Sequence, residues 1–587
     1  MVAEQFEVNE EIAKIFHHLG VFLEMEGVDF KPAAYQRAAA ILRTLNQSVA
    51  DIYRTSDIKG LEALEGIGKN LAYKIKEYLE TGKIQTYEKY VKEYPIDIDS
   101  LDAVPGLGPK TIKWLWTELG VRNLADLKIA AEKGLIRALP HGGEKLEQNI
   151  LIHLNELETT SKRWLYAEIQ PLAEKIRLQL ENIPGVAQVN ITGSYRRKKS
   201  TIGDLDYVVV AKNPSLVMET FTHLQNPKVE RIISHGDTRS SIKVLDGLEV
   251  DLRVVPKKAY GSACQYFTGS KEHNIELRKI ATSKSLKLNE YGLFKGNKQI
   301  AGESEESLYA NLGLRYIEPE LRENRGEIEW ARGRKKLSLL SVKDIRGDLH
   351  IHSDWDGGQD SISDLAEYAR LKLGYDYIGI SDHTKFLKIE HGLDEEQLMA
   401  QRLEIQKLNS KYKDRHINFT ILQGCEANIL EDGSIDINET ILKQLDYVIA
   451  GLHSQLDQAE EITTMRLIKA IRNPYVDIIS HPTARLINRR PPVQMNWLAV
   501  LDAAIESHTI LEINASPLRL DLDALKVKEA KEAGVKFAID SDTHALEDLN
   551  RMEYGVNEAR RGWAEKSDVV NTFLLAHLIK SLKRNLS

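Results

Sequence analysis

Three carboxylates in two short apolar stretches have the spacing of a site for divalent cations. Asp204 and Asp206 are two residues apart in GDLDYVVV, and Asp251 follows in LEVDLRVV. Both stretches are typical of β-strands, in which residues two apart face the same side. Carboxylates on one face can bind a pair of Mg²⁺ or Mn²⁺ ions about 3.5–4 Å apart. Such a pair would activate a 3′-hydroxyl and neutralise a triphosphate, so the trio predicts two-metal nucleotidyl transfer.

Phosphate-binding groups precede the first two carboxylates. Gly193 and Ser194 end a predicted strand, where a glycine allows a phosphate to approach closely. Arg196 and Arg197 follow and can offer forked donors to phosphate oxygens. The alternative is a solvated strand face with alternating charge. Asp is disfavoured inside strands, and four apolar residues follow Asp206, so this alternative fits poorly.

A second set of metal-binding residue types lies in the C-terminal part of the chain. Histidines and carboxylates recur where predicted strands end, and in a β/α barrel these ends converge on one face. Imidazoles and carboxylates without sulfur suit Zn²⁺, Mn²⁺ or Fe²⁺, and so many ligands imply two or three ions that activate water against a phosphate ester. A single strand-end histidine is usually structural, but the repeated placement argues against that. The set is Asp348, His350, His352, Asp382, His383, Glu426, His453, His481, Asp542 and His544.

Two glycine turns near the N-terminus share one pattern. LEGIGKNLAYKI (64–75) and VPGLGPKTIKWL (104–115) each have a G-x-G turn before a predicted helix that contains lysine. Backbone N–H groups at such a helix start bind a phosphate without reading base sequence. One copy would fit an ordinary helical hairpin equally well, but two copies favour helix-hairpin-helix units that bind DNA. The predicted DNA contacts are Gly66, Gly68, Lys69, Gly106, Gly108 and Lys110.

The elements around these motifs predict a multidomain α+β and α/β protein. The chain has 587 residues, too many for one hydrophobic core. Helical periodicity covers residues 1–94 and 95–155, and strands mix with helices over 156–258 and 259–317. The stretch 318–344 is polar and charge-dense, as is typical of a connection between domains. Strands alternate with helices over 345–587, which predicts a parallel β/α layer or barrel.

Composition bears on the partners and the cellular compartment of the protein. The net charge is −8 at pH 7, which does not by itself indicate a nucleic-acid partner, although RRKK at 196–199 is a local basic cluster. The two cysteines provide no disulfide framework, so we expect a reducing, cytoplasmic compartment. The N-terminus resembles no signal peptide and no apolar stretch is long enough to span a bilayer, so we expect no membrane partner. We also expect a monomer.

The N-terminal half resembles a known family. The motifs GSYRR, GDLDYVVV, LEVDLRVV, YFTGSKEHNIELR (266–278) and LNEYGLF (288–294) resemble, in order, those of family X DNA polymerases, the class of DNA polymerase beta. The resemblance implies a 5′-phosphate-binding domain (1–94), a duplex-binding domain (95–155), a palm (156–258) and a nucleotide-selecting, thumb-like domain (259–317). It therefore implies a gap-filling DNA repair polymerase with gapped or primer-template DNA and dNTPs as substrates.

The same resemblance assigns roles to individual residues. It implies triphosphate binding at the glycine-serine turn, contacts to the incoming sugar and base from the YFTGS segment, and one contact to the template strand. The residues concerned are Gly193, Ser194 and Arg197 for the triphosphate, Tyr266, Phe267 and Gly269 for the sugar, Asn274 for the base and Arg278 for the template.

In the first domain the resemblance also points to 5′-deoxyribose-phosphate lyase activity. Lys74 matches the Schiff-base lysine of beta-type members, and Lys31 and Tyr35 match 5′-phosphate contacts. Phe30 and Asn70 stand where those members have polar or basic residues, which makes the pocket less basic. The alternative is that Lys74 is a solvated lysine on an amphipathic helix.

The C-terminal motifs HIH, SDH, GCEANI, LHS, HPTARL and DSDTH resemble the polymerase-and-histidinol-phosphatase (PHP) domain. That family implies a distorted (β/α)₇ barrel with a trinuclear metal site and 3′–5′ exonuclease, 3′-end-processing or abasic-site endonuclease activity. This chain has Gly357 at the usual aspartate position, so we expect Asp356 to serve as a ligand instead. Two alternatives remain: a DNA-end-binding protein in which only the PHP phosphoesterase is active, and a small-molecule phosphatase of the histidinol-phosphate type.

Overall fold

The computed structural model describes two compact units, residues 1–161 and 162–587. The described residues are 2–28, 30–45, 48–64, 66–102, 104, 107–138, 143, 146–148, 150–151, 154, 162–334 and 336–586. Gly106 of the second predicted hairpin lies outside them. None of the helices in these ranges is both long and apolar enough to cross a membrane.

The first unit is helical, as its periodicity predicts. Its described helices build one core around Phe16, Leu19 and Ile75 and a second around Leu115 and Leu127. The helices are α1 (Val2–Met25), α2 (Lys31–Thr44), α3 (Val49–Glu62), α4 (Lys69–Thr81), α5 (Gln85–Glu93), α6 (Ile98–Asp102), α7 (Pro109–Leu119) and α8 (Leu124–Glu132). Both predicted glycine turns lead into a helix, because Gly68 is the N-cap residue of α4 and Gly108 that of α7.

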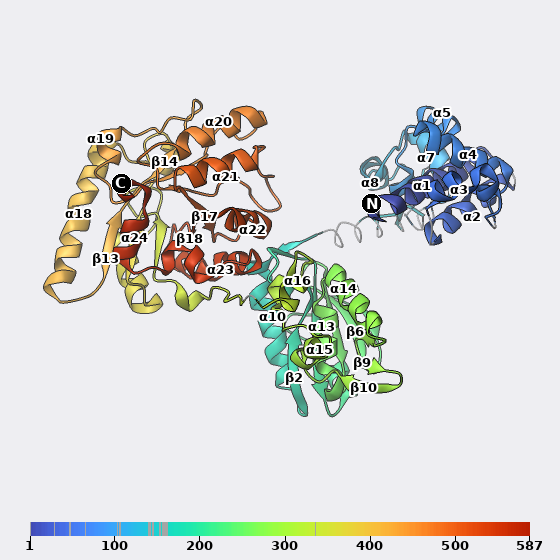
Figure 1. Cartoon of the computed structure of the whole chain (residues 1–587), viewed down its shortest axis with the longest axis horizontal. Helices are drawn as coiled ribbons and strands as arrows, with labels where there is room; N and C mark the ends of the chain where they lie inside the picture. The colour runs from blue at the N-terminus through green and yellow to red at the C-terminus, as the bar shows by residue number, and fades with distance from the viewer. Residues whose placement is uncertain are drawn as a thin grey trace. The chain divides into compact units, whose positions relative to one another are not determined.

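The second unit begins with a five-stranded mixed sheet over the predicted palm (Figure 1). Its strand order is β2-β4-β7-β6-β5; β4 and β7 are parallel, and the other neighbours are antiparallel. Helices α10 and α12 cover the apolar face of the sheet. The elements are β1 (Trp164–Leu165), α10 (Tyr166–Glu181), β2 (Val186–Ile191), α11 (Gly193–Arg196), β3 (Thr201–Ile202), β4 (Asp204–Ala211), α12 (Pro214–Thr222), β5 (Arg231–His235), β6 (Arg239–Val244), β7 (Leu248–Val254) and α13 (Tyr260–Thr268).

A small α+β layer follows, in which a three-stranded antiparallel sheet packs with helices. Its core continues into the stretch 318–344, through the buried side chains of Leu321, Ile328 and Ala331. The elements are α14 (Lys271–Ser283), β8 (Lys287–Asn289), β9 (Gly292–Lys295), β10 (Lys298–Ala301), α15 (Glu305–Asn311), η2 (Pro319–Leu321) and α16 (Glu327–Arg332).

The stretch 318–344, predicted as a connection between domains, has several of its charged side chains buried in the fold. Arg322 is fully buried and Glu305 nearly so, and the two are paired at 2.6 Å. Glu327 is likewise buried against His273 at 2.7 Å. A charge-dense sequence can form part of a core when its charges pair with partners elsewhere in the fold. Composition alone does not reveal those partners.

The C-terminal region is the predicted parallel barrel. Strands β11-β12-β13 and β14-β15-β16-β17-β18 form two parallel sheets, and bridges between His383 and Glu426 and between Ile351 and Thr543 join them into a ring. Only Gly424 and Cys425 separate β13 from β14, so the ring counts seven strand positions, one of them interrupted. The strands are β11 (Gly347–Ile351), β12 (Tyr377–Ile380), β13 (Thr420–Gln423), β14 (Glu426–Asn428), β15 (Ile449–Gly451), β16 (Ile478–Ile479), β17 (Ile510–Asn514) and β18 (Phe537–Asp540).

Helices surround these strands, and Figure 1 shows α18, α20 and α21 on the outside of the barrel. The outer helices include α17 (Ile362–Tyr368), α18 (Glu395–Asp414), α19 (Glu439–Leu442), α20 (Glu460–Ile471), α21 (Trp497–Glu506), α22 (Ala524–Ala533), α23 (Met552–Arg561) and α24 (Leu575–Ser581). Helix α23 also contacts the palm. Gln170 of α10 donates to Glu553 at 2.7 Å and accepts a hydrogen bond from the Tyr554 hydroxyl at 2.9 Å.

Candidate active sites

The three predicted palm carboxylates lie on neighbouring strands. Asp204 and Asp206 belong to β4, and Asp206 is the register partner of Asp251 on the parallel strand β7. Burial and the negative charges of Asp204 and Asp251 raise the pKa of Asp206 to about 7. Crowded carboxylates whose ionisation is this unfavourable need positive charge nearby, which fits a site for divalent cations.

A cavity of about 440 Å³ opens beside these carboxylates and brings most of the predicted nucleotide site together. Residues from β4, α11, α13 and α14 line it, and it includes four residues that the sequence motifs do not assign. The predicted residues are Gly193, Ser194, Arg197, Asp204, Asp206, Tyr266, Phe267, Gly269, Asn274 and Arg278, and the additional ones are Arg163, Lys199, Ser270 and Lys271.

Gly193 and Ser194 have the properties of a phosphate-binding turn. Gly193 has φ +62°, and a Cβ at this position would lie 2.5 Å from Oδ2 of Asp206. Only glycine therefore lets the chain pass so close to the carboxylate. The hydroxyl of Ser194 is buried and, within the described residues, has no hydrogen-bond partner. A buried, unpartnered hydroxyl in a cavity fits the binding of a ligand oxygen.

Residues of α13 and α14 form another part of the cavity lining. Asn274 donates a hydrogen bond to the Tyr266 carbonyl at 2.7 Å and accepts one from Gln265 at 2.6 Å. The rings of Tyr266 and Phe267 meet edge to face at 5.1 Å between centroids. These contacts fix the side chains that the sequence assigns to the incoming sugar and base.

In the first unit, the predicted 5′-phosphate contacts lie on α2 and the predicted Schiff-base lysine lies on α4. Lys31 is the first residue of α2, and the ring of Tyr35 packs against Phe16 at 5.5 Å. Lys74 is half-buried on α4 and donates to the Thr86 hydroxyl at 2.8 Å. Burial lowers the pKa of the Lys74 ammonium, which favours the neutral amine that a Schiff-base nucleophile needs.

Glu426 lies at the centre of the second candidate site, inside the barrel. Its Oε1 atom is 2.9 Å from Nε2 of His481 and 3.2 Å from Nε2 of His453. Its Oε2 atom is 3.1 Å from Nε2 of His383 and 3.3 Å from Nε2 of His350. Four imidazoles from four different strand ends thus converge on one carboxylate, as the strand-end placement predicts.

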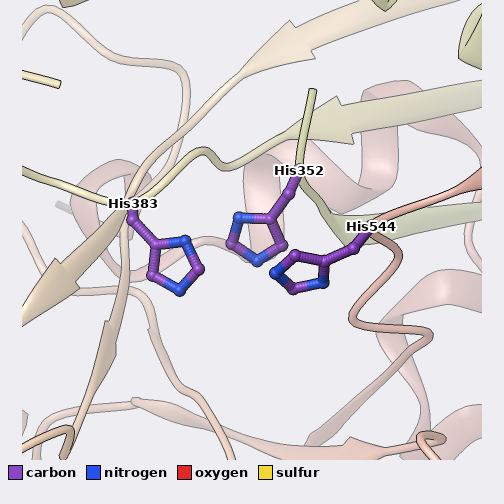
Figure 2. A group of neighbouring side chains, drawn as sticks. All are labelled: His352, His383 and His544. Carbon is purple, nitrogen blue, oxygen red and sulfur yellow. The ribbon is translucent and has the colours of Figure 1, made fainter. Parts of the chain in front are cut away.

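Asp542, His352 and His544 extend the same cluster, whereas Asp348 accepts hydrogen bonds from the backbone N–H groups of His350 and Ser541 at 3.2 Å. Asp542 lies 3.5 Å from Nε2 of His352 and 3.8 Å from Nδ1 of His544. Figure 2 shows the imidazoles of His352, His383 and His544 facing one another, with their centroids 4.1 and 4.2 Å from the middle ring, that of His352. Several groups of three donor atoms lie within 4.8 Å of one another, as metal binding requires.

The protonation of this cluster also fits metal ions. The Nε2 atoms of His350, His352 and His453 are buried without a hydrogen bond in the described structure. Although burial disfavours the charged imidazole, Asp356 raises the pKa of His352 to about 10. Burial and the charge of Arg519 lower the pKa of His481 to about 3. Buried carboxylates thus draw protons onto some imidazoles, and bound cations would replace those protons.

Asp356 belongs to the cluster although its position differs from the family pattern. Its Oδ2 atom lies 2.8 Å from Nδ1 of His352 and 2.9 Å from Nδ1 of His383. The space that a side chain at Gly357 would need is taken by the carboxylate of Glu390. Asp356 can therefore contribute either as a ligand or by orienting the two imidazoles.

Glu512 is a buried member of this site that the sequence analysis does not identify. Its carboxylate accepts hydrogen bonds from Nδ1 of His350 at 2.6 Å and from the backbone N–H of His481. Arg519 lies 3.4 Å from Asp542. The available signal for Glu512 is a glutamate inside the apolar strand TILEINAS, where an acidic side chain is unexpected.

Comparison with known proteins matches this arrangement. The DNA polymerase beta palm model matches residues 165–279 and the DNA polymerase beta thumb model matches residues 263–323. A helix-hairpin-helix domain matches residues 7–84, and a SAM-like helix-hairpin-helix tandem matches residues 98–156.

Individual relatives cover both halves of the chain. The present chain is 37% identical over 584 residues to the DNA polymerase/3′-5′ exonuclease PolX of Bacillus subtilis (strain 168). The match covers 98% of this chain and 99% of that protein. A protein of Thermoanaerobacter sp. (strain X514) named "Probable phosphatase" is 37% identical over 178 residues, 28% of this chain and 70% of its own length. DNA polymerase lambda of Arabidopsis thaliana is 27% identical over 346 residues, 53% of this chain and 62% of its own length.

The fold and its two clusters define an enzyme class in which a beta-type nucleotidyltransferase palm and a histidine-rich metal barrel occur in one chain. The chain belongs to the family X DNA polymerases, in the PolX group that carries a C-terminal PHP domain.

Proposed function

We propose that the chain is a template-directed DNA polymerase that fills gaps, with a 3′–5′ exonuclease in its C-terminal barrel. The observation that supports this most is the single cavity that unites the D-x-D carboxylates with the phosphate, sugar and base contacts. The near full-length similarity to PolX of Bacillus subtilis supports the pairing of the two activities. We further propose the domain boundaries and site residues given under "Sequence analysis".

In the palm, Asp204, Asp206 and Asp251 would hold two Mg²⁺ or Mn²⁺ ions. When bound, such ions lower the pKa of the 3′-hydroxyl and neutralise the triphosphate and the leaving pyrophosphate. The Ser194 hydroxyl and the Arg197 guanidinium bind the phosphate oxygens and orient them for in-line attack. Tyr266, Phe267 and Asn274 position the sugar and base.

In the barrel, the strand-end histidines with Glu426 and Asp542 would hold two or three Zn²⁺, Mn²⁺ or Fe²⁺ ions. When bound, such ions lower the pKa of water and offset the charge of the phosphate ester. Glu512 keeps the His350 ring in one orientation, so that Nε2 faces the cluster. We also propose that the same site removes other 3′-blocking groups and incises DNA at abasic sites.

One gapped, 5′-phosphorylated duplex tests the two-site proposal. Asp251→Ala should abolish nucleotide incorporation and spare degradation of the 3′ end, and His350→Ala should do the reverse. Thermal unfolding of both variants serves as the control for folding. Loss of both activities in either folded variant would contradict two separate sites. Exonuclease without any incorporation by the wild-type protein would instead favour a DNA-end-binding protein with an inactive palm.

Three further proposals concern the compartment, the lyase activity and the oligomeric state. Cys264 and Cys425 are both free and buried, which supports the proposal of a reducing cytoplasm. Lyase activity at Lys74 is proposed from its half-buried, pKa-lowered amine. The monomeric state stays a prediction.

A further inference from the structure

Glu323 lies between the nucleotide cavity and the barrel, and no sequence motif assigns it a role. It follows η2 in the stretch that composition predicts to be a connection between domains. Its side chain is only 12% exposed, although a carboxylate would ordinarily remain in water. A buried carboxylate needs partners, and Glu323 has three, which come from two different segments of the chain.

The first partner is Arg197, the arginine proposed to bind the triphosphate. Its Nε donates to Oε1 of Glu323 at 2.9 Å, and its Nη1 donates to the Thr268 carbonyl at 2.5 Å. Within the described structure these are the only hydrogen bonds of this guanidinium. A guanidinium has five N–H donors in one plane, so two bonds from different directions fix the plane and leave donors for a ligand. Gly269 leaves the room for this arrangement, because a Cβ there would lie 3.2 Å from Nη1.

The other partners surround Glu323 with positive charge. Nζ of Lys199 lies 3.9 Å from its Oε2 atom, and Nη2 of Arg561 lies 3.9 Å from Oε1. Lys199 also lines the nucleotide cavity, whereas Arg561 belongs to helix α23 of the barrel. Arg561 also pairs with Glu558 at 3.0 Å, so Arg197 and Lys199 are the two cations that Glu323 faces on the side of the cavity. One carboxylate beside two cations leaves positive charge there, which suits a site that receives a triphosphate.

Hydrogen bonds from the barrel helix α23 and from the wall of the nucleotide cavity hold the segment that carries Glu323. Arg560 of α23 donates to Glu320 at 2.9 Å, and Ser270 on the cavity wall donates its N–H to the Arg322 carbonyl at 2.9 Å. The segment 319–323 thus lies between the barrel helix and the nucleotide cavity. A shift of α23 would move Glu323, and with it the guanidinium plane of Arg197.

We propose that Glu323 is a positioning residue for nucleotide binding, which holds Arg197 in the orientation that a triphosphate needs and is itself held by helix α23. This inference rests on the proposed polymerase function and on Arg197 as a triphosphate contact. Under this proposal, helix α23 of the barrel supports the polymerase site, while the barrel also carries the proposed exonuclease site. The opposite possibility is that the carboxylate competes with the triphosphate for Arg197, in which case its removal would strengthen nucleotide binding.

The test compares Glu323→Ala with Glu323→Gln in the full chain, by single-nucleotide gap filling. A glutamine keeps an acceptor for Nε of Arg197, whereas an alanine removes it. We expect the alanine variant to raise KM for dNTP by roughly tenfold or more, the scale of a lost hydrogen bond to a charged group. We expect a much smaller change in kcat, because this contact serves ground state and transition state alike. The glutamine variant should keep KM within about threefold of wild type.

Glu303→Ala is the matched control, since Glu303 pairs with Lys257 on the exposed surface at 3.3 Å and does not contact Arg197. It should leave KM for dNTP unchanged. An alanine variant with unchanged or lowered KM, or a glutamine variant as impaired as the alanine one, would overturn the positioning role.

The support from the barrel is tested with Arg561→Gln and, in case that variant folds poorly, Arg560→Gln. Each should raise KM for dNTP by about threefold or more, and the effect should be non-additive with Glu323→Ala. Exonuclease activity on single-stranded DNA should stay within about twofold, since neither arginine lies in the metal cluster. Additive effects, or loss of exonuclease without any change in KM, would contradict support by α23.

The two proposals can fail separately. Absence of incorporation by the wild-type protein would refute the polymerase function itself. Incorporation by wild type that collapses in Arg197→Ala, but is unchanged in Glu323→Ala, would leave the polymerase function standing and refute only the role of Glu323.

Discussion

Asp206 and Asp251 lie directly opposite each other on the parallel strands β4 and β7. Parallel strands that are neighbours in a sheet lie about 4.8 Å apart, so the two carboxyl groups repel each other unless a cation intervenes. Burial first, then the charge of Asp204 and that of Asp251, raise the pKa of Asp206 to about 7, so the pairing is one of the causes of this shift. The pairing also ties the metal site to sheet register, because a slip of one residue would turn one carboxylate to the opposite face.

The hydroxyl of Ser241 donates to Asp251 and should tune this site. We predict that Ser241→Ala lowers the apparent affinity for Mg²⁺ by about 10–100-fold, as outer partners of metal ligands usually do. Gap filling measured against Mg²⁺ concentration should show recovery at high Mg²⁺. Ser240→Ala is the matched control, because that buried hydroxyl has no partner in the described structure. Equal effects of both variants would show that the strand, and not the hydrogen bond, matters.

Gly193→Ala should inactivate the polymerase site. The added Cβ would meet the Asp206 carboxylate and would require a left-handed backbone. A displacement of a catalytic group by about 1 Å can cost about 10²-fold in rate, so we expect at least that loss in gap filling. Gly185→Ala is the control with the same strain, since φ is +87° there but the nearest atom is 3.6 Å away. Comparable losses in both variants would indicate backbone strain alone.

Glu512→Gln should impair the barrel site without affecting the palm. The substitution keeps the size of the side chain but weakens the bond to Nδ1 of His350. Exonuclease activity should fall by about 10–100-fold, with gap filling unchanged. Asp477→Asn is the control, because Asp477 is buried in the same barrel but pairs with Arg584 at 2.6 Å instead of with the cluster. A loss of exonuclease in the control as well would point to general damage to the barrel.

Glu305 should make the stability of the second unit sensitive to acid. Burial disfavours the ionised carboxyl, but Arg322 and Arg196 outweigh it and lower the pKa of Glu305 to about 2, from 4.5. A lowered folded-state pKa stabilises the fold above about pH 4.5, and this stabilisation is lost as pH falls through about 2. The difference corresponds to about 3 kcal/mol of unfolding free energy. Urea unfolding at several pH values should show a shallower acid dependence for Glu305→Gln than for Glu303→Gln.

Lys74 should form a covalent adduct with a 5′-deoxyribose-phosphate end. Because burial lowers the pKa of its ammonium, more neutral amine is available to attack the sugar aldehyde than at an exposed lysine. Borohydride should trap the adduct in wild type and in Lys76→Ala, and Lys74→Ala should abolish it. Lys76 is the matched control on the same helix. Trapping that persists in Lys74→Ala would leave this lysine as a phosphate contact only.

The sequence predicts the features whose signal is local. The D-x-D pair, the glycine turns and the strand-end histidines depend on short-range periodicity, which the fold preserves. In contrast, Arg197 and Glu323 are 126 residues apart, and nothing in their own segments indicates that they meet. The stretch 318–344 shows the same limit, since its charges predict a connection between domains and do not reveal the tertiary partners that bury Arg322 and Glu327. The role of Glu512 could not be predicted for a related reason, because its partner His350 lies 162 residues away in the sequence.

The contact between Gln170 and Glu553 spans 383 residues of chain, which has a consequence for synthesis. At about 5–20 residues per second, the ribosome needs roughly 20–80 s to make the stretch between them. The palm therefore leaves the ribosome well before the helix that completes its surface. A chain interrupted by a late stop codon would carry the palm carboxylates but lack the helix whose Glu553 and Tyr554 contact Gln170.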